Sequence, residues 1–222
     1  SITGPRVVCE GSSAKYSVTN VAGSTYSWTV TGGTFTGSGS IINITWGVPP
    51  AGTVSVIETN AVGCFDTLVL LNVTINPIPI TPPISGPTPV CEGTTGSVYT
   101  VAPTAGSTYN WSIAGNGNIT FGQGTNSITV DWGLAGTATI TIVEVNSLGC
   151  PGVPQTFSVT INGTPTANAT SVQDTICEGT SVQLNGTATN GTILWTTSGN
   201  GTFSNATIAS PIYTSGSADV PL

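Results

Sequence analysis

The chain contains an internal repeat whose copies carry cysteine at the same place. Residues 86–93 restate residues 4–11, and both segments contain the sequence Cys-Glu-Gly. A third Cys-Glu-Gly begins at Cys177. A period of about 80 residues indicates one structural unit used several times, so a residue at a repeated position is expected to have the same role in each copy. The repeat therefore predicts an architecture before it predicts any chemistry.

The surface of such a chain must be almost free of charge. Only 5% of the 222 residues are charged, with 2 Lys or Arg against 9 Asp or Glu and a net charge of −7, whereas about a quarter is usual. Two basic side chains cannot neutralise a phosphate backbone or an anionic membrane surface, so nucleic acid and anionic membrane surfaces are excluded as partners. The many aromatic and β-branched residues favour folded strands over disorder. No apolar run is long enough for direct membrane insertion.

The cysteines occupy one early and one late position in each full unit. This pattern predicts one disulfide inside each unit, Cys9–Cys64 and Cys91–Cys150, and leaves Cys177 unpaired within the chain. There is no histidine and no Cys-x-x-Cys cluster, so no metal site is expected. Disulfides form in oxidising compartments, which predicts an extracellular or cell-surface protein.

Short runs of alternating or β-branched residues, separated by Gly- and Pro-rich turns, predict strands and no helix. Several such strands in about 80 residues, with one Trp in the middle, are typical of an immunoglobulin-like β-sandwich. The predicted fold class is all-β, with tandem immunoglobulin-like sandwich repeats of which the third is incomplete. The strands are expected at residues 16–18, 25–30, 41–46, 53–58 and 67–75, then 99–101, 108–113, 127–132, 137–143 and 156–161, then 182–184, 192–197, 201–204 and 211–213.

The same pattern predicts the domain boundaries. Residues 1–77 form the first repeat, 78–84 a stiff Pro-rich linker, 85–163 the second repeat and 164–222 a truncated third. The third repeat supplies only part of a sandwich and would leave sheet edges exposed. Two ways of completing it stay open: sequence beyond Leu222, or strands donated by another chain.

Several of the repeated segments resemble the PKD-like and immunoglobulin-like repeats of very large cell-surface adhesins from Bacteroidota. In that family the repeats space out surface adhesins, including gliding-motility adhesins exported by the type IX secretion system. The resemblance implies PKD-like repeats with the same structural role in this chain. It is carried by residues 86–93, 105–111, 122–128 and 131–133, and in the third unit by 194–203 and 213–219.

The acidic residues of the repeat are candidate ligands or catalytic groups. Glu10, Glu92 and Glu178 follow the early cysteines, and Glu58 and Glu144 precede the late ones. Calcium takes six to eight oxygen ligands, usually from clustered carboxylates, whereas these acids are scattered and recur in every unit. A structural role, with the turn glutamates bonding backbone amides, is therefore favoured. No catalytic, cofactor-binding or metal-ligating residue is expected.

The tryptophans could form either a core or a platform for stacking sugars. Trp28, Trp111 and Trp195 lie in the middle of predicted strands between alternating residues, which favours the core. For Trp46 and Trp132 both the core and an outward position stay open.

Two short segments resemble the Asp-Ser/Thr-aliphatic motif at which Bacteroidota attach O-glycans to exported proteins. Residues 66–68 and 174–176 match it, which makes Thr67 and Thr175 candidate O-glycosylation sites.

Catalysis has few groups to use, since the chain has no histidine and its basic residues are Arg6 and Lys15. The predicted function is therefore structural: a non-enzymatic stalk or filament segment of a secreted bacterial adhesin, spacing an adhesive tip from the cell. Its expected partners are neighbouring repeats of the same long polypeptide, with surface glycans or other adhesin chains as further candidates. The alternatives are a glycan- or protein-binding module and an accessory domain of a secreted carbohydrate-active protein.

Overall fold

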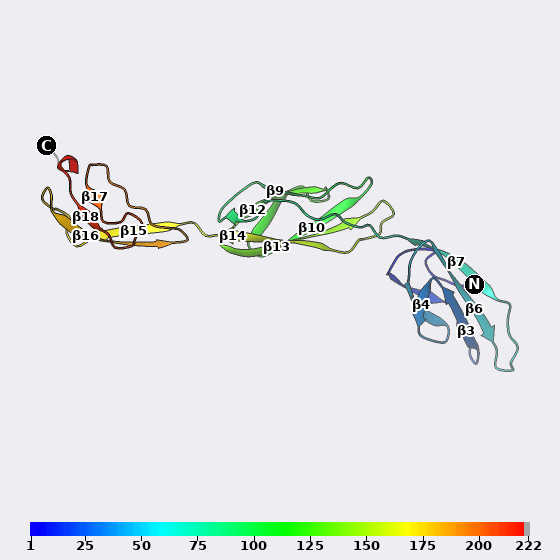
Figure 1. Cartoon of the computed structure of the whole chain (residues 1–222). Coiled ribbons are helices and arrows are strands. Elements are labelled where there is room, and N and C mark those ends of the chain that lie inside the picture. Colours follow the sequence, from blue (N-terminus) through cyan, green and yellow to red (C-terminus); the bar gives the residue numbers. More distant parts are fainter. Residues whose placement is uncertain (220–222) are drawn as a thin grey trace.

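The structure is a computed structural model that describes residues 1–219. Three strand-rich units follow one another in an elongated row, coloured blue to cyan, green, and yellow to red in Figure 1. No sheet takes strands from more than one unit. The helical content of residues 1–219 is one short 3-10 turn, η1 (Ser217–Asp219), and nothing there is long and apolar enough to cross a membrane as a helix. The predicted all-β fold class is confirmed.

The first unit is a sandwich of two sheets, with strand orders β1-β7-β6-β3 and β2-β5-β4. Successive side chains of a strand point to opposite faces, and β5 shows this most clearly because Ile42, Ile44 and Trp46 are buried while their neighbours are exposed. The strands are β1 (Val7–Cys9), β2 (Ser13–Ser17), β3 (Thr25–Thr31), β4 (Gly33–Thr36), β5 (Ile41–Trp46), β6 (Ala51–Thr59) and β7 (Val69–Asn76).

The second unit repeats this sandwich, with strand orders β10-β13-β14-β8 and β11-β12-β9. Ile128, Val130 and Trp132 on β12 are buried like their counterparts on β5. The two units have separate cores with no residue in common. The strands are β8 (Val90–Cys91), β9 (Ser97–Thr100), β10 (Thr108–Ala114), β11 (Gly117–Phe121), β12 (Ser127–Trp132), β13 (Gly136–Val145) and β14 (Gln155–Asn162).

The early cysteine of each sandwich ends a short strand that the sequence pattern did not predict. β1 pairs in parallel with β7, placing Cys9 opposite Asn76, and β8 pairs in parallel with β14, placing Cys91 opposite Asn162. Strands of two or three residues are too short to show an alternating pattern. They matter here because they place each early cysteine beside the last residue of its sandwich.

The third unit has a single sheet in the described residues, with strand order β15-β16-β18-β17. The predicted strand at 192–197 is wrong, since these residues form no strand. The Nε1 of Trp195 instead donates a hydrogen bond to the carbonyl of Ile208 (2.9 Å), and its side chain is half-buried. The strands are β15 (Thr166–Ser171), β16 (Ser181–Thr189), β17 (Thr202–Phe203) and β18 (Ile212–Thr214).

The Pro-rich connection between the first two units packs against the second unit. Thr81 and Ile84 are only 5% and 7% exposed, and Ile84 belongs to the core of the second unit. Gly152 lies so close that a Cβ there would come within 2.7 Å of the carbonyl oxygen of Pro79. The linker is therefore packed against the second unit at Pro79, Thr81 and Ile84.

Candidate functional site

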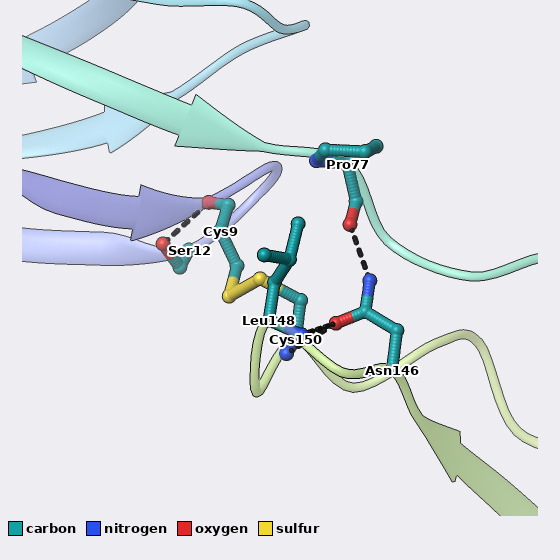
Figure 2. Close-up of a disulfide and its surroundings, with 6 residues drawn as sticks. All are labelled: Cys9, Ser12, Pro77, Asn146, Leu148 and Cys150. Atoms are coloured by element: carbon teal, nitrogen blue, oxygen red, sulfur yellow. Dashed lines mark hydrogen bonds between the residues drawn. A yellow bond between two sulfur atoms is a disulfide. The ribbon is translucent and has the colours of Figure 1, made fainter. Parts of the chain in front are cut away.

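The structural feature that stands out is a covalent joint between the first two units. Cys9 and Cys150 form a disulfide across 141 positions of sequence, with their Cα atoms 5.5 Å apart, an ordinary separation for such a bond. Figure 2 shows the bond between the end of β1 and a loop of the second unit. The predicted pairs Cys9–Cys64 and Cys91–Cys150 are therefore wrong. Cys64, Cys91 and Cys177 are free and exposed.

The pairing inside a unit fails because its two cysteines lie at opposite ends of the sandwich. Cys9 lies beside Asn76, the last residue of β7, whereas Cys64 lies in the loop that precedes β7. The eight residues of β7 extend over about 24 Å, and a disulfide requires Cα atoms within about 7 Å. We call the end with Cys9 the turn end and the end with Cys64 the loop end. The turn end of one unit meets the loop end of the next.

The loop end of the second unit is a tight loop, residues 146–150, braced by one asparagine. The Oδ1 atom of Asn146 accepts hydrogen bonds from the backbone amides of Leu148 and Cys150, both at 3.0 Å. The backbone amide of Asn146 donates to the carbonyl of Cys150 (3.1 Å). Gly149 adopts a φ of 79°, which glycine accepts without strain. The loop therefore holds Cys150 in one fixed position.

The turn end of the first unit is the Cys-Glu-Gly segment itself. The amide and the hydroxyl of Ser12 both donate hydrogen bonds to the carbonyl of Cys9. Gly11, which lies between Cys9 and Ser12 in the sequence, has a φ of 72°. The amide of Glu10 donates to the carbonyl of Asn76 (2.9 Å), which ties the turn to the last strand. Cys9 thus projects from a rigid corner.

A hydrogen bond accompanies the disulfide across the joint. The Nδ2 atom of Asn146 donates to the carbonyl of Pro77 (2.8 Å), the first residue after β7. Asn146 therefore holds its own loop with its oxygen and the preceding unit with its nitrogen (Figure 2). Asn146 was not among the site residues predicted from the sequence. The repeat of Asn-x-aliphatic-Gly-Cys at residues 60–64 and 146–150 was the signal for it.

The turn glutamates differ in their contacts. The Oε2 atom of Glu92 accepts a hydrogen bond from the amide of Ala135 (3.1 Å), which is the structural role that the sequence favoured. Within residues 1–219, neither Glu10 nor Glu178 makes a side-chain hydrogen bond, and no group of three His, Cys, Asp or Glu side chains could hold a metal ion. Glu144 is fully buried and Glu58 is half-buried.

The structure also places the remaining predicted site residues. Trp28 and Trp111 lie in the two sandwich cores, and so do Trp46 and Trp132, for which an outward position had stayed open. Trp195 is only half-buried, because the third unit has no second sheet in the described residues to cover it.

The two candidate threonines, Thr67 and Thr175, are exposed and lie outside the strands. The Oδ1 atom of Asp66 accepts hydrogen bonds from the amide and the hydroxyl of Thr67.

Among solved structures, the chain is similar to the adhesin FdeC of Escherichia coli, with 16% identity and a TM-score of 0.42 over 98% of this chain and 87% of that one. It is also similar to the I-band fragment I67–I69 of titin, with 11% identity and a TM-score of 0.38 over 99% and 90%. A third is a SusE-like surface-located polysaccharide-binding protein of Bacteroides thetaiotaomicron, with 12% identity and a TM-score of 0.42 over 71% and 33%.

The assignment to a family comes from sequence. A search of curated proteins gives no match to this chain. The family model described as a PKD-like domain matches it twice, over residues 1–73 and 77–161, which together are more than half of the chain. The two matched segments contain most of each sandwich and both cysteines of the joint. The chain therefore belongs to the family of PKD-like domains.

Proposed function

We propose that this chain is a stalk segment of a secreted bacterial cell-surface adhesin, in which PKD-like units are joined end to end and space an adhesive tip from the cell. The observation that carries the proposal is the Cys9–Cys150 disulfide, because it links the turn end of one unit to the loop end of the next. A bond inside one unit would stabilise only that unit. A bond between units resists bending and pulling at the joint, which is what a stalk requires.

The composition supports the same function. A surface with 2 basic residues in 222 offers few sites to trypsin-like proteases, and the disulfide is a bond of oxidising compartments. Both favour exposure at the cell surface, and the bond between units favours neighbouring repeats as partners. We assign the parent to the Bacteroidota adhesins exported by the type IX system, including the gliding-motility adhesins. The flanking sequence tests this assignment, since it should contain further repeats and a separate C-terminal export domain.

Two finer points belong to this proposal. The repeats are divided at residues 1–77, 78–84, 85–163 and 164–222, and Thr67 and Thr175 carry O-glycans in the native protein. The exposure of both threonines supports the second point. Mass spectrometry of peptides from the native protein tests it, and unmodified peptides at both positions would contradict it.

Small-angle X-ray scattering of the chain tests the stalk itself. The expected result is the profile of a rod, with a maximum dimension close to that of the three units in a row (Figure 1). Units folded back against one another would give a compact profile and would overturn the proposal.

Recognition of a glycan or protein is a second candidate function, favoured by an aromatic cluster in the third unit. The rings of Trp195 and Phe203 have centroids 6.3 Å apart, and those of Phe203 and Tyr213 lie at 4.9 Å. All three side chains are half-buried, whereas the sandwich tryptophans are buried. Exposed aromatic faces are typical of sugar- and protein-binding surfaces. Glycan-array binding that is lost in Trp195→Ala and kept in Leu194→Ala would support this function, and an array without binding would remove its glycan form.

A further inference from the structure

The loop end of the first unit is a copy of the loop that forms the joint. In residues 60–64 the Oδ1 atom of Asn60 accepts hydrogen bonds from the amides of Val62 (3.1 Å) and Cys64 (2.9 Å). The amide of Asn60 donates to the carbonyl of Cys64 (2.9 Å), and Gly63 has a φ of 85°. Every one of these features matches residues 146–150 of the second unit. The first unit thus carries the same preformed loop.

The Asn60–Cys64 loop has no partner in the described residues. Cys150 is fully buried in its disulfide, whereas Cys64 is exposed and reduced. Val62, at the position of Leu148, is 83% exposed. A side-chain nitrogen at Asn60 is available where Asn146 uses its own to bind the carbonyl of Pro77. The loop is built for a contact that it does not make within the chain.

The other half of the joint also recurs without a partner. The turn at Cys177 repeats that at Cys9, because the amide and hydroxyl of Thr180 donate to the carbonyl of Cys177 as those of Ser12 do to Cys9. Gly179 has the same φ of 72° as Gly11. Cys177 is exposed and free. Cys177 therefore projects from a turn equivalent to the one that holds Cys9.

The two unpaired halves lie at opposite ends of the row of units. β7 leads away from the Cys64 loop toward the second unit. In the third unit Thr166 pairs with Thr189 near the second unit and Ser171 pairs with Leu184 farther away, so the segment 172–180 with Cys177 is at the outer end. Cys91 does not lie at an outer end of the row. It pairs with Asn162, at the end of the second unit from which the chain continues into the third unit.

We propose that the Asn60–Cys64 loop docks the cysteine turn of a further PKD-like unit and forms with it a disulfide that repeats the Cys9–Cys150 joint. The Cys177 turn of a second copy of this chain is such a turn and forms a Cys177–Cys64 bond. Copies of this chain therefore join head to tail through this contact, since the two surfaces differ and lie at opposite ends. The inference deepens the proposed stalk function and names its partner.

Bond formation needs a two-electron oxidant, which a small disulfide such as oxidised glutathione supplies. The Cys64 thiolate attacks the glutathione disulfide, forms a mixed disulfide and releases one glutathione thiolate. The Cys177 thiolate of the second copy then displaces the other glutathione. One disulfide is broken and one is formed, and the two cysteine protons end on two molecules of reduced glutathione.

The test uses the full chain with its Cys9–Cys150 bond intact and its other thiols reduced, incubated with oxidised and reduced glutathione. Non-reducing electrophoresis should show a ladder of oligomers, and peptide mapping should show Cys64 linked to Cys177. The variants Cys64→Ser and Cys177→Ser should each remain monomeric alone and give dimers, but nothing larger, when mixed. Cys91→Ser is the control and should form the ladder normally. Variants that dimerise alone as fast as they do together would mean random oxidation and would overturn the proposal.

A second measurement separates docking from the mere presence of two thiols. Asn60→Ala removes the hydrogen bonds that hold the loop and the side-chain nitrogen that would bind the docked chain, but it leaves Cys64 in place. Loss of these hydrogen bonds should slow the formation of the Cys64–Cys177 disulfide by about fivefold or more. Asn72→Ala, at an exposed position of β7, should link at the normal rate. Equal rates for the two variants would overturn the proposal. A chain that stays monomeric but scatters as a rod would remove this inference alone, whereas a compact chain would remove the stalk.

Discussion

The ring of Tyr16 meets the indole of Trp46 edge to face, with ring centroids 5.7 Å apart. Tyr99 and Trp132 reproduce this contact in the second unit at 5.8 Å. In both units the tyrosine hydroxyl donates to a proline carbonyl near the start of the repeat, at 2.8 and 2.7 Å. The repeated Gly-Pro, Tyr and Trp residues are thus one contact that closes each sandwich.

The glycine of this contact is predicted to tolerate no side chain. In the second unit a Cβ at Gly86 would overlap the ring of Tyr99, which is fully buried. We expect Gly86→Ala to destabilise that unit by about 1–3 kcal/mol, because the ring must move within a packed core. The control is Gly133→Ala, where a Cβ would make an ordinary contact of 3.6 Å. Calorimetry should show a lower Tm for the first variant only, and equal transitions would contradict the prediction.

The same tyrosines predict a loss of stability in alkali. Burial raises the pKa of Tyr16 and of Tyr99 above the ordinary value of about 10, outweighing the opposite effect of the neighbouring indoles. Because the unfolded chain ionises first, the stability is fully present below pH 10 and is lost as the pH rises beyond it.

Denaturant unfolding between pH 8 and 11 measures this loss. Replacing both Tyr16 and Tyr99 with Phe should flatten the alkaline fall, although the lost hydrogen bonds lower the stability at pH 8. Tyr26→Phe, which changes a half-buried phenol, should leave the fall in place. An unchanged alkaline slope in the double variant would refute the assignment.

The fold was largely predictable because the longer strands alternate between apolar and polar residues in a way that is visible in the sequence. β5 and β12 have the predicted bounds, since alternation over six residues is a strong local signal. The joint was not predictable in the same way. Whether Cys9 is near Cys64 or Cys150 depends on which end of the sandwich each occupies, and this follows from the parallel pairing of β1 with β7. A three-residue strand carries too little pattern to reveal that pairing.

In the third unit a strand-like sequence does not form a strand. The run around Trp195 has the composition of a strand, and the sequence predicted one, but the chain there makes no ladder. β propensity mostly reflects packing against neighbours. The four described strands of this unit form one sheet and provide no second layer against which such a strand would pack.

Removing the joint is predicted to free the units without unfolding them. The two sandwich cores share no residue, so the double variant Cys9→Ser/Cys150→Ser should keep both thermal transitions within a few degrees of their normal positions. Small-angle scattering should show a broader distribution of maximum dimensions, because only the linker contacts and the Asn146–Pro77 hydrogen bond remain. Cys64→Ser should change neither measurement. Loss of a complete unfolding transition in the double variant would show that the bond instead stabilises a core.

The C-terminal turn of the third unit is predicted to loosen in acid. The carboxylate of Asp219 accepts a hydrogen bond from the hydroxyl of Tyr213 (2.5 Å) and another from the amide of Gly216 (2.7 Å). These bonds, the Tyr213 bond first, lower the pKa of Asp219 below its ordinary value of about 3.9. A lowered folded-state pKa gives stability that is present above the ordinary value and is lost as the pH falls through the lowered one.

Amide hydrogen exchange at Gly216 measures this turn directly. Protection should be constant from neutral pH down to about pH 4 and should fall below it, after correction for intrinsic exchange. Asp219→Asn should exchange faster at neutral pH and respond less to acid, because the charged acceptor is gone. Asp66→Asn, in the first unit, is the matched control and should leave Gly216 unaffected. Equal protection in Asp219→Asn and the unmodified chain would show that backbone contacts alone hold the turn.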